Sequence, residues 1–166
     1  MNKHYIFFID ISQGFESVKN KFTEFLVERK KTEPLSIMSV ITLDECYNII
    51  VVNESLNMVD VDVFEKLKNN CDKLTLFDTL APAIRKILNY HNILELKGYD
   101  TRAVIFVKNS NDTSTIVSQS SLLLQFIYAY NKDWKIYFSS SNEKLCLIFN
   151  NIGCQILELD ELKSLI

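Results

Sequence analysis

Three short apolar runs, each of which stops at polar residues, constrain the fold of this chain more than any other feature. The first is Tyr5–Ile9, five apolar or aromatic residues that end at Asp10. The second is the run Arg102–Asn109, and the third is the WKIYFSS stretch that begins at Trp134. A continuous apolar run of this length is typical of a parallel strand that is covered on both faces. The polar residues therefore mark the carboxyl ends of buried strands.

Residues with helical spacing follow these runs. A first helix is expected over about 16–31 and is ended by Pro34, with an apolar face made by Val18, Phe22, Phe25 and Leu26. A leucine-rich helix is expected around Leu122–Ile127. Another helical stripe lies at Leu145–Ile152, with Asn142 as its N-cap and Gly153 as the glycine that follows its last turn. Strands and helices therefore alternate through much of the chain.

Capping patterns predict two helices in the middle of the chain. Asp62 and Glu65 have the spacing of a capping box, which indicates a short helix over Val63–Lys68. A longer helix is expected to carry an apolar stripe from Leu80, with Asp78 or Thr79 as its N-cap. Pro82 then falls in the first turn, where its missing N–H is tolerated.

The segments LSIMSVITL and CYNIIVVN have the composition of β-strands and are separated by Asp44-Glu45, which suits a tight hairpin. The whole pattern predicts one α/β domain over 1–166, with a doubly wound, mostly parallel central sheet and helices on both faces. Tyr5–Ile9 is expected in the middle of the sheet, between Arg102–Val107 and the hairpin. Tyr47–Val52 is expected to be the antiparallel strand at the sheet edge.

Composition excludes several classes of function. The net charge is -3, and the only local cluster of cations is Arg29-Lys30-Lys31 at the expected end of a helix, so nucleic acid is not an expected partner. No apolar run approaches the ~20 residues that cross a bilayer, and none has the form of a signal peptide. The cysteines and histidines show no metal-binding spacing. A cytoplasmic protein without a membrane partner is expected.

Enzymatic chemistry remains as the alternative function. The three glycines form no phosphate-binding motif, which disfavours a nucleotide-binding loop. An aspartate after a first strand, such as Asp10, is also the nucleophile of phosphatases with the motif D-x-D-x-T, but Ser12 stands at the second aspartate position. The alternative is therefore a doubly wound α/β enzyme that acts on a phosphorylated or nucleotide-like substrate, with Asp10 at its site.

Motifs at the strand and helix ends resemble those of the von Willebrand factor A (vWA) domain. The first run leads into Asp10-Ile11-Ser12-Gln13-Gly14, a later helix begins with LTLFDTL (Leu74–Leu80), and the second run ends in VKNS. In the vWA domain an apolar strand leads into D-x-S-x-S, a loop and helix carry T-x-L-Y-D-x-L, and a later strand ends in T-D-G. The resemblance covers nearly the whole chain in the order and spacing of its elements.

The vWA resemblance implies a metal-ion-dependent adhesion site, in which serine, threonine and aspartate oxygens hold Mg²⁺ or Mn²⁺. Asp10 and Ser12 match two of these ligand positions. The second serine position is Gly14, which has no side-chain oxygen, and the second aspartate position is the neutral Asn109. One anionic ligand remains where the family has two.

The threonine position of this adhesion site is also altered. Leu74 stands at it, and Thr75 follows one residue late, which turns a side chain by about 100° at the entry to a helix. A degenerate site is therefore expected, with no cofactor or only weakly bound Mg²⁺, for which Asp10 and Ser12 are the residual ligands.

The predicted function is a non-enzymatic protein–protein interaction module of vWA type that has little or no metal dependence. Its partner is expected to bind at the loops after the parallel strands, which converge at one edge of the sheet. Leu74, Leu76 and Phe77 are expected to supply apolar anchors within a polar rim. The candidate partner-binding residues are Ser12, Gly14, Leu74, Thr75, Asn109 and Asp112.

Overall fold

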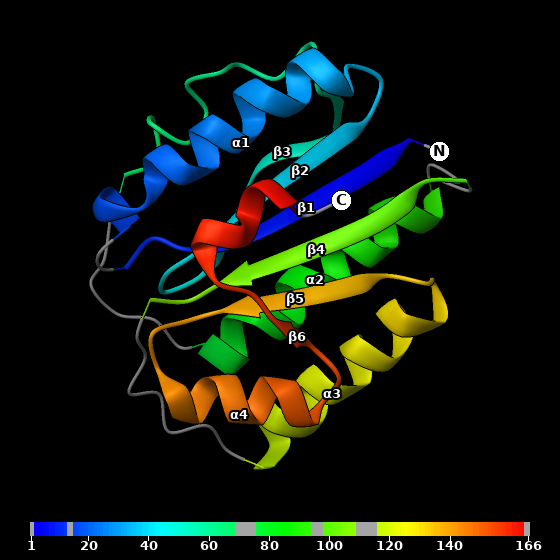
Figure 1. The fold of residues 1–166 in the computed structure, drawn as a ribbon. Coiled ribbons are helices and arrows are strands. Elements are labelled where there is room, and N and C mark those ends of the chain that lie inside the picture. Colours follow the sequence, from blue (N-terminus) through cyan, green and yellow to red (C-terminus); the bar gives the residue numbers. More distant parts are fainter. Residues whose placement is uncertain (1, 13–14, 69–75, 94–97, 109–115, 165–166) are drawn as a thin grey trace.

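The computed structural model of the chain describes residues 2–12, 15–68, 76–93, 98–108 and 116–164, without the side chains of 91–93 and 116–118. These residues form a six-stranded sheet in the order β3-β2-β1-β4-β5-β6 (Figure 1). Neighbouring strands are parallel except β2 and β3, which are antiparallel. The predicted fold class is confirmed. The strands are β1 (Lys3–Asp10), β2 (Ile37–Leu43), β3 (Tyr47–Ser55), β4 (Asp100–Phe106), β5 (Lys135–Ser139) and β6 (Gln155–Ile156).

β1 lies in the middle of the sheet, as predicted, because both of its faces are apolar. Phe7 is in register with Val40 of β2 on one side and Val104 of β4 on the other. Alternate side chains point to opposite faces of a strand. Phe8 accordingly packs in the hydrophobic cluster on one face of the sheet, and Phe7 packs in the cluster on the other face.

The helices cover both faces (Figure 1). One face, here called the α1 face, is covered by α1 (Lys19–Thr32) and the 3₁₀ helix η2 (Leu159–Ser164). The opposite face, the α2 face, is covered by α2 (Leu76–Ile93), α3 (Ile116–Asn131) and α4 (Glu143–Asn151). Within the described part of the chain, no helix combines the length and the apolar character that a bilayer crossing requires.

The short helix predicted over Val63–Lys68 is wrong, because the segment consists of turns. The Asp60 carboxylate accepts a hydrogen bond from the Asp62 N–H at 3.0 Å and one from Lys66 Nζ at 2.6 Å. An aspartate that bonds the backbone two residues later closes a turn and competes with a helix. The apolar side chains of this segment still pack on the α1 face.

The helix boundaries also differ from the prediction. α1 begins at Lys19, after a 3₁₀ turn (η1, Phe15–Ser17). α2 begins at Leu76, so Asp78 lies in its first turn and Pro82 lies inside the helix. The ends of α4 follow the prediction. The Asn142 side chain accepts hydrogen bonds from two backbone N–H groups, and Gly153 has a φ of 97° after the last turn.

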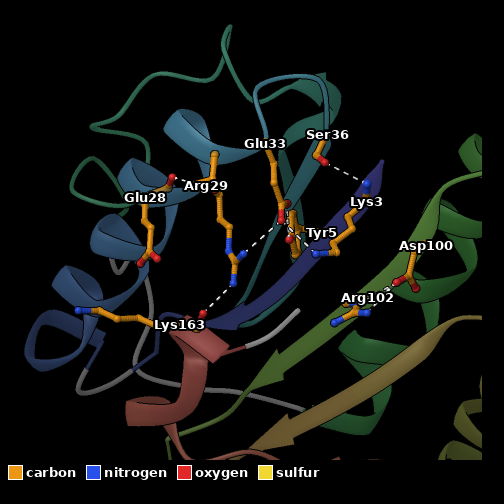
Figure 2. A network of polar contacts seen from close by, with 10 residues as sticks. Lys3, Tyr5, Glu28, Arg29, Glu33, Ser36, Asp100, Arg102 and Lys163 are labelled. Atoms are coloured by element: carbon orange, nitrogen blue, oxygen red, sulfur yellow. Dashed lines mark hydrogen bonds and ion pairs between the residues drawn. The ribbon is translucent and has the colours of Figure 1, made fainter. Parts of the chain in front are cut away.

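A network of charged side chains joins the amino end of β1 to α1 and η2 (Figure 2). Glu33, just after α1, accepts hydrogen bonds from Lys3 Nζ at 3.0 Å, the Tyr5 hydroxyl at 2.6 Å and Arg29 Nη1 at 3.2 Å. Arg29 Nη2 also donates to the backbone carbonyl of Lys163 in η2 at 2.6 Å. The network therefore lies at the opposite end of β1 from Asp10, and it holds the end of the chain against α1.

Candidate functional site

Asp10 is the last residue of β1 and lies at the carboxyl edge of the sheet, as predicted. Its side chain is fully buried. Oδ1 accepts a hydrogen bond from the Ser12 N–H at 2.8 Å and another from the Ser12 hydroxyl. Oδ2 accepts one from the Lys108 N–H, at the end of β4, at 3.2 Å. Asp10 therefore joins the loop after β1 to the loop after β4.

The environment of Asp10 shifts the pKa of its carboxyl upward. Burial raises the pKa of the Asp10 carboxyl above its ordinary value, and the hydrogen bonds from Ser12 and Lys108 oppose this rise. The negative charge of Asp44, a buried neighbour at the end of β2, raises the pKa further. The three donors from its own loops suit Asp10 to hold those loops in place.

Lys108 extends this connection to the loop after β5. Its carbonyl accepts a hydrogen bond from the Ser141 N–H at 3.3 Å and others from the hydroxyls of Ser140 and Ser141. Its ammonium group reaches back and donates to the Ser17 hydroxyl at 3.2 Å. The ends of β1, β4 and β5 are thus tied together through one residue.

A pocket of about 240 Å³ opens beside this junction, between α1, the carboxyl ends of β4 and β5, and η2. Its apolar lining comes from Val18, Phe106 and Leu159. Its polar lining is mixed in charge and rich in hydroxyl groups, and comprises Lys21, Lys108, Ser139, Ser140, Ser141, Glu158 and Asp160. Lys21 and Asp160 form an ion pair at 2.7 Å. We call this the carboxyl-edge pocket.

The pocket residues from α1 and η2 were missed by the sequence analysis. Lys21 and Asp160 lie far apart in the chain and meet only because η2 packs beside α1. A lysine and an aspartate so far apart in the sequence form no motif, so a single sequence does not predict that they form an ion pair. The loop after β5, with its three serines, was the one part of the pocket that the sequence indicated, because it follows an expected strand.

The predicted site residues are only partly within the described structure. Ser12 is 3% exposed and its hydroxyl is turned toward Asp10. The other candidate partner-binding residues lie outside the described residues, namely Gly14, Leu74, Thr75, Asn109 and Asp112. The proposal that Leu76 and Phe77 act as surface anchors is wrong. They are 0% and 3% exposed, because both belong to the cluster on the α2 face.

The described residues provide few ligands for a metal ion. Nowhere in the ranges given above do three or more His, Cys, Asp or Glu side chains come together in a way that could hold one. Asp10 and Ser12 are adjacent, but both oxygens of Asp10 already accept hydrogen bonds, and the Ser12 hydroxyl donates to Asp10. These two residues alone fit a divalent cation poorly, since Mg²⁺ requires near-octahedral oxygen coordination.

Comparison with known proteins gives no match to a family model and none to a curated protein sequence. Solved structures do match. Proximal thread matrix protein 1 from the mussel byssus superposes on 99% of this chain with a TM-score of 0.69 and 8% sequence identity. This chain spans less than half of that protein, 46% of its length.

The second structure is a domain of nearly the same size. The VWA domain of SpRpn10 superposes on 99% of this chain, over 93% of its own length, with a TM-score of 0.65 and 12% identity. At such identities the similarity concerns the fold and not the residues of a site. With its strand order, its antiparallel edge strand and helices on both faces, the chain has the fold of a von Willebrand factor A domain.

Proposed function

We propose that residues 1–166 form a non-enzymatic, cytoplasmic protein-interaction module of vWA type that binds a partner protein at the carboxyl edge of its sheet. The observation that carries the proposal is the carboxyl-edge pocket, whose lining combines apolar side chains with charges and hydroxyls. An apolar side chain of the partner that enters such a pocket, with polar contacts around it, dominates binding in many interfaces.

The surroundings of Asp10 support binding over catalysis. A nucleophile or general base must reach a substrate, but this carboxylate is fully buried and bonded to its own loops. The loops that it holds are the surface offered to the partner. We therefore propose that the other predicted loop positions, Gly14, Leu74, Thr75, Asn109 and Asp112, contribute beside the pocket, and that Ser12 acts by holding the first loop.

Binding is proposed to have little or no metal dependence. Millimolar Mg²⁺ or Mn²⁺ is expected to move the melting temperature by no more than about 1–2 °C, because a ligand at or below its dissociation constant stabilises by no more than about 0.4 kcal/mol. The measurement is a thermal melt with each cation and with EDTA. A rise of several degrees that Asp10→Ala abolishes would contradict the proposal and indicate an adhesion site that holds metal.

The partner site is tested by placing a large cation at the carboxyl edge. Ser141→Arg at the rim of the pocket and Asn109→Arg in the predicted loop are each expected to reduce capture of the partner at least about tenfold. Thr32→Arg, an exposed change at the other end of α1, is the control. The readout is quantitative recovery of proteins from a lysate of the native source by the wild-type chain and the three variants.

Thermal melting of the three variants establishes that each remains folded. Proteins whose recovery falls with both carboxyl-edge variants but not with Thr32→Arg are the candidate partners. If every captured protein is recovered equally by all variants, the partner does not bind at the carboxyl edge.

A further inference from the structure

β3 forms one edge of the sheet and leaves its outer side open. Its nine residues, YNIIVVNES, pair with β2 on the inner side. Among the residues that the structure describes, no backbone group of 48–52 has a backbone partner outside this ladder. An edge strand points alternate N–H and C=O groups away from its neighbour, so β3 presents a row of donors and acceptors.

β3 lacks most of the features with which proteins protect such an edge. It contains no lysine and no proline, and its single charge is Glu54, near one end. Ile50 and Val52 are 44% and 36% exposed. The described strand retains two protective features, namely pairing with β2 that shifts register on both sides of Val51 and a backbone φ of 48° at Asn53.

The apolar surface continues past the carboxyl end of β3. Leu35 and Met58 are 67% and 69% exposed. Backbone hydrogen bonds bring their segments together, since the N–H of Leu56 donates to the carbonyl of Ser36 at 2.8 Å. Exposed apolar side chains and open backbone groups therefore occur along the same edge of the sheet, a combination that favours an interface there.

We propose that β3 pairs with β3 of a second copy of this chain, antiparallel about a two-fold axis at Val51. Such pairing joins the two six-stranded sheets into one continuous sheet and removes both open edges. The interface is separate from the carboxyl edge of the sheet, so it leaves the proposed partner site accessible in each copy.

The sequence of β3 selects a second copy as the occupant. An axis at Val51 places Ile50 of one chain opposite Val52 of the other, so the exposed apolar side chains meet each other twice. The same register places Glu54 opposite Asn48. The only charge of the strand therefore faces an amide, and no two like charges oppose each other across the interface.

The test is sedimentation equilibrium of the full chain over a range of concentrations. The wild-type chain is expected to form a reversible dimer. Ile50→Lys is expected to raise the dimer dissociation constant at least about tenfold, because the two-fold axis places two ammonium groups in the interface. Ile127→Lys is the matched control, since Ile127 on α3 is 47% exposed, close to the 44% of Ile50, and α3 lies beside β5, away from β3 (Figure 1).

A second variant separates loss of pairing from loss of folding. In the double variant Ile50→Lys with Val52→Glu, each new lysine faces a new glutamate in the proposed register, so the dimer is expected to return. Far-UV circular dichroism and thermal melts establish that the variants are folded. A wild-type chain that stays monomeric at every concentration overturns the proposal. The open side of β3 would then be the binding site for an extended segment of another protein.

Two other results also overturn it. One is a dimer that Ile127→Lys dissociates and Ile50→Lys does not, which would place the interface on α3. The other is a double variant that remains as weakly associated as Ile50→Lys, because the proposal includes the register centred on Val51.

Discussion

Replacing Phe7 by alanine is expected to lower the free energy of unfolding by about 3–5 kcal/mol, the largest effect of any change proposed for this chain. Phe7 is fully buried at the centre of the α1-face cluster. Its ring lies edge-on to three others, with centroid distances of 5.7 Å to Phe22, 5.5 Å to Phe25 and 5.8 Å to Phe64. Alanine leaves a cavity among aromatic rings that belong to a helix and a turn, which cannot both move inward to fill it.

Urea unfolding followed by circular dichroism measures this loss, which corresponds to a fall in melting temperature of about 10 °C for a domain of this size. Leu147→Ala, at a side chain that is 63% exposed on α4, is the control and is expected to change the free energy of unfolding by no more than about 0.5 kcal/mol. A loss below about 1 kcal/mol for Phe7→Ala would show that the cluster repacks and that the aromatic contacts do not define the core.

Replacing Glu33 by glutamine is expected to lower the free energy of unfolding by about 2 kcal/mol at neutral pH. The carboxylate bonds Lys3, Tyr5 and Arg29 at once, and its side chain is only 20% exposed. Glutamine is neutral and replaces one of the two acceptor oxygens by an NH2 donor, so one hydrogen bond is lost and the two cations lose their counter-ion at a largely buried position. Glu24→Gln, in the exposed pair with Lys163, is the control and is expected to cost less than about 0.5 kcal/mol.

The effect of Glu33→Gln is expected to depend on pH. Burial alone would raise the pKa of Glu33, but the hydrogen bonds from Tyr5 and Lys3 and the charges of Lys3 and Arg29 hold it below its ordinary value of 4.5. A carboxyl whose pKa is lowered by folding contributes stability above the pKa of the unfolded chain, and that stability is lost as the pH falls through the folded value.

The wild-type and Glu33→Gln chains should therefore differ most above pH 4.5 and converge as the pH is lowered past it. Urea titrations at a series of pH values measure this difference. A difference that stays constant or grows toward low pH would mean that the ionised carboxylate is not the stabilising species.

The arrangement of the sheet was predictable because its signals are local and repeated. Tyr5–Ile9 is apolar on both faces, and only a central strand between two helical layers buries both faces of such a run. The antiparallel edge strand followed from the short Asp44-Glu45 connection, which leaves no room for a crossover. In both cases a few neighbouring residues carry the information.

The boundaries around α2 were not predictable from such signals. Val63, Phe64 and Leu67 have helical spacing, yet Asp60 closes a turn before them and the segment packs as turns on the α1 face. Pro82 suggested a helix start near Asp78, but the helix begins at Leu76 because the burial of Leu76 and Phe77 outweighs the hydrogen bond that proline removes. A local turn opposed the first helix, and tertiary packing moved the start of the second.

The candidate site was likewise predictable only in part. Asp10 could be placed at the carboxyl edge because it terminates an apolar run, and the structure confirms that place. Its partner Lys108 follows the second apolar run, whose end was expected to converge with that of the first. The pocket residue Leu159 comes from η2, and a single sequence contains no signal that places η2 beside this edge.

The central position of β1 has a consequence for the order in which this chain can assemble. β1 is made first, and one of its sides pairs with β2, which follows closely in the sequence. Its other side pairs with β4, where His4 meets Thr101, much later in the sequence than Ile37, its partner in β2. The entropy lost on closing a loop grows with its length, so the second pairing is the costlier one. On the ribosome, one side of the most apolar strand must therefore wait unpaired until β4 has emerged.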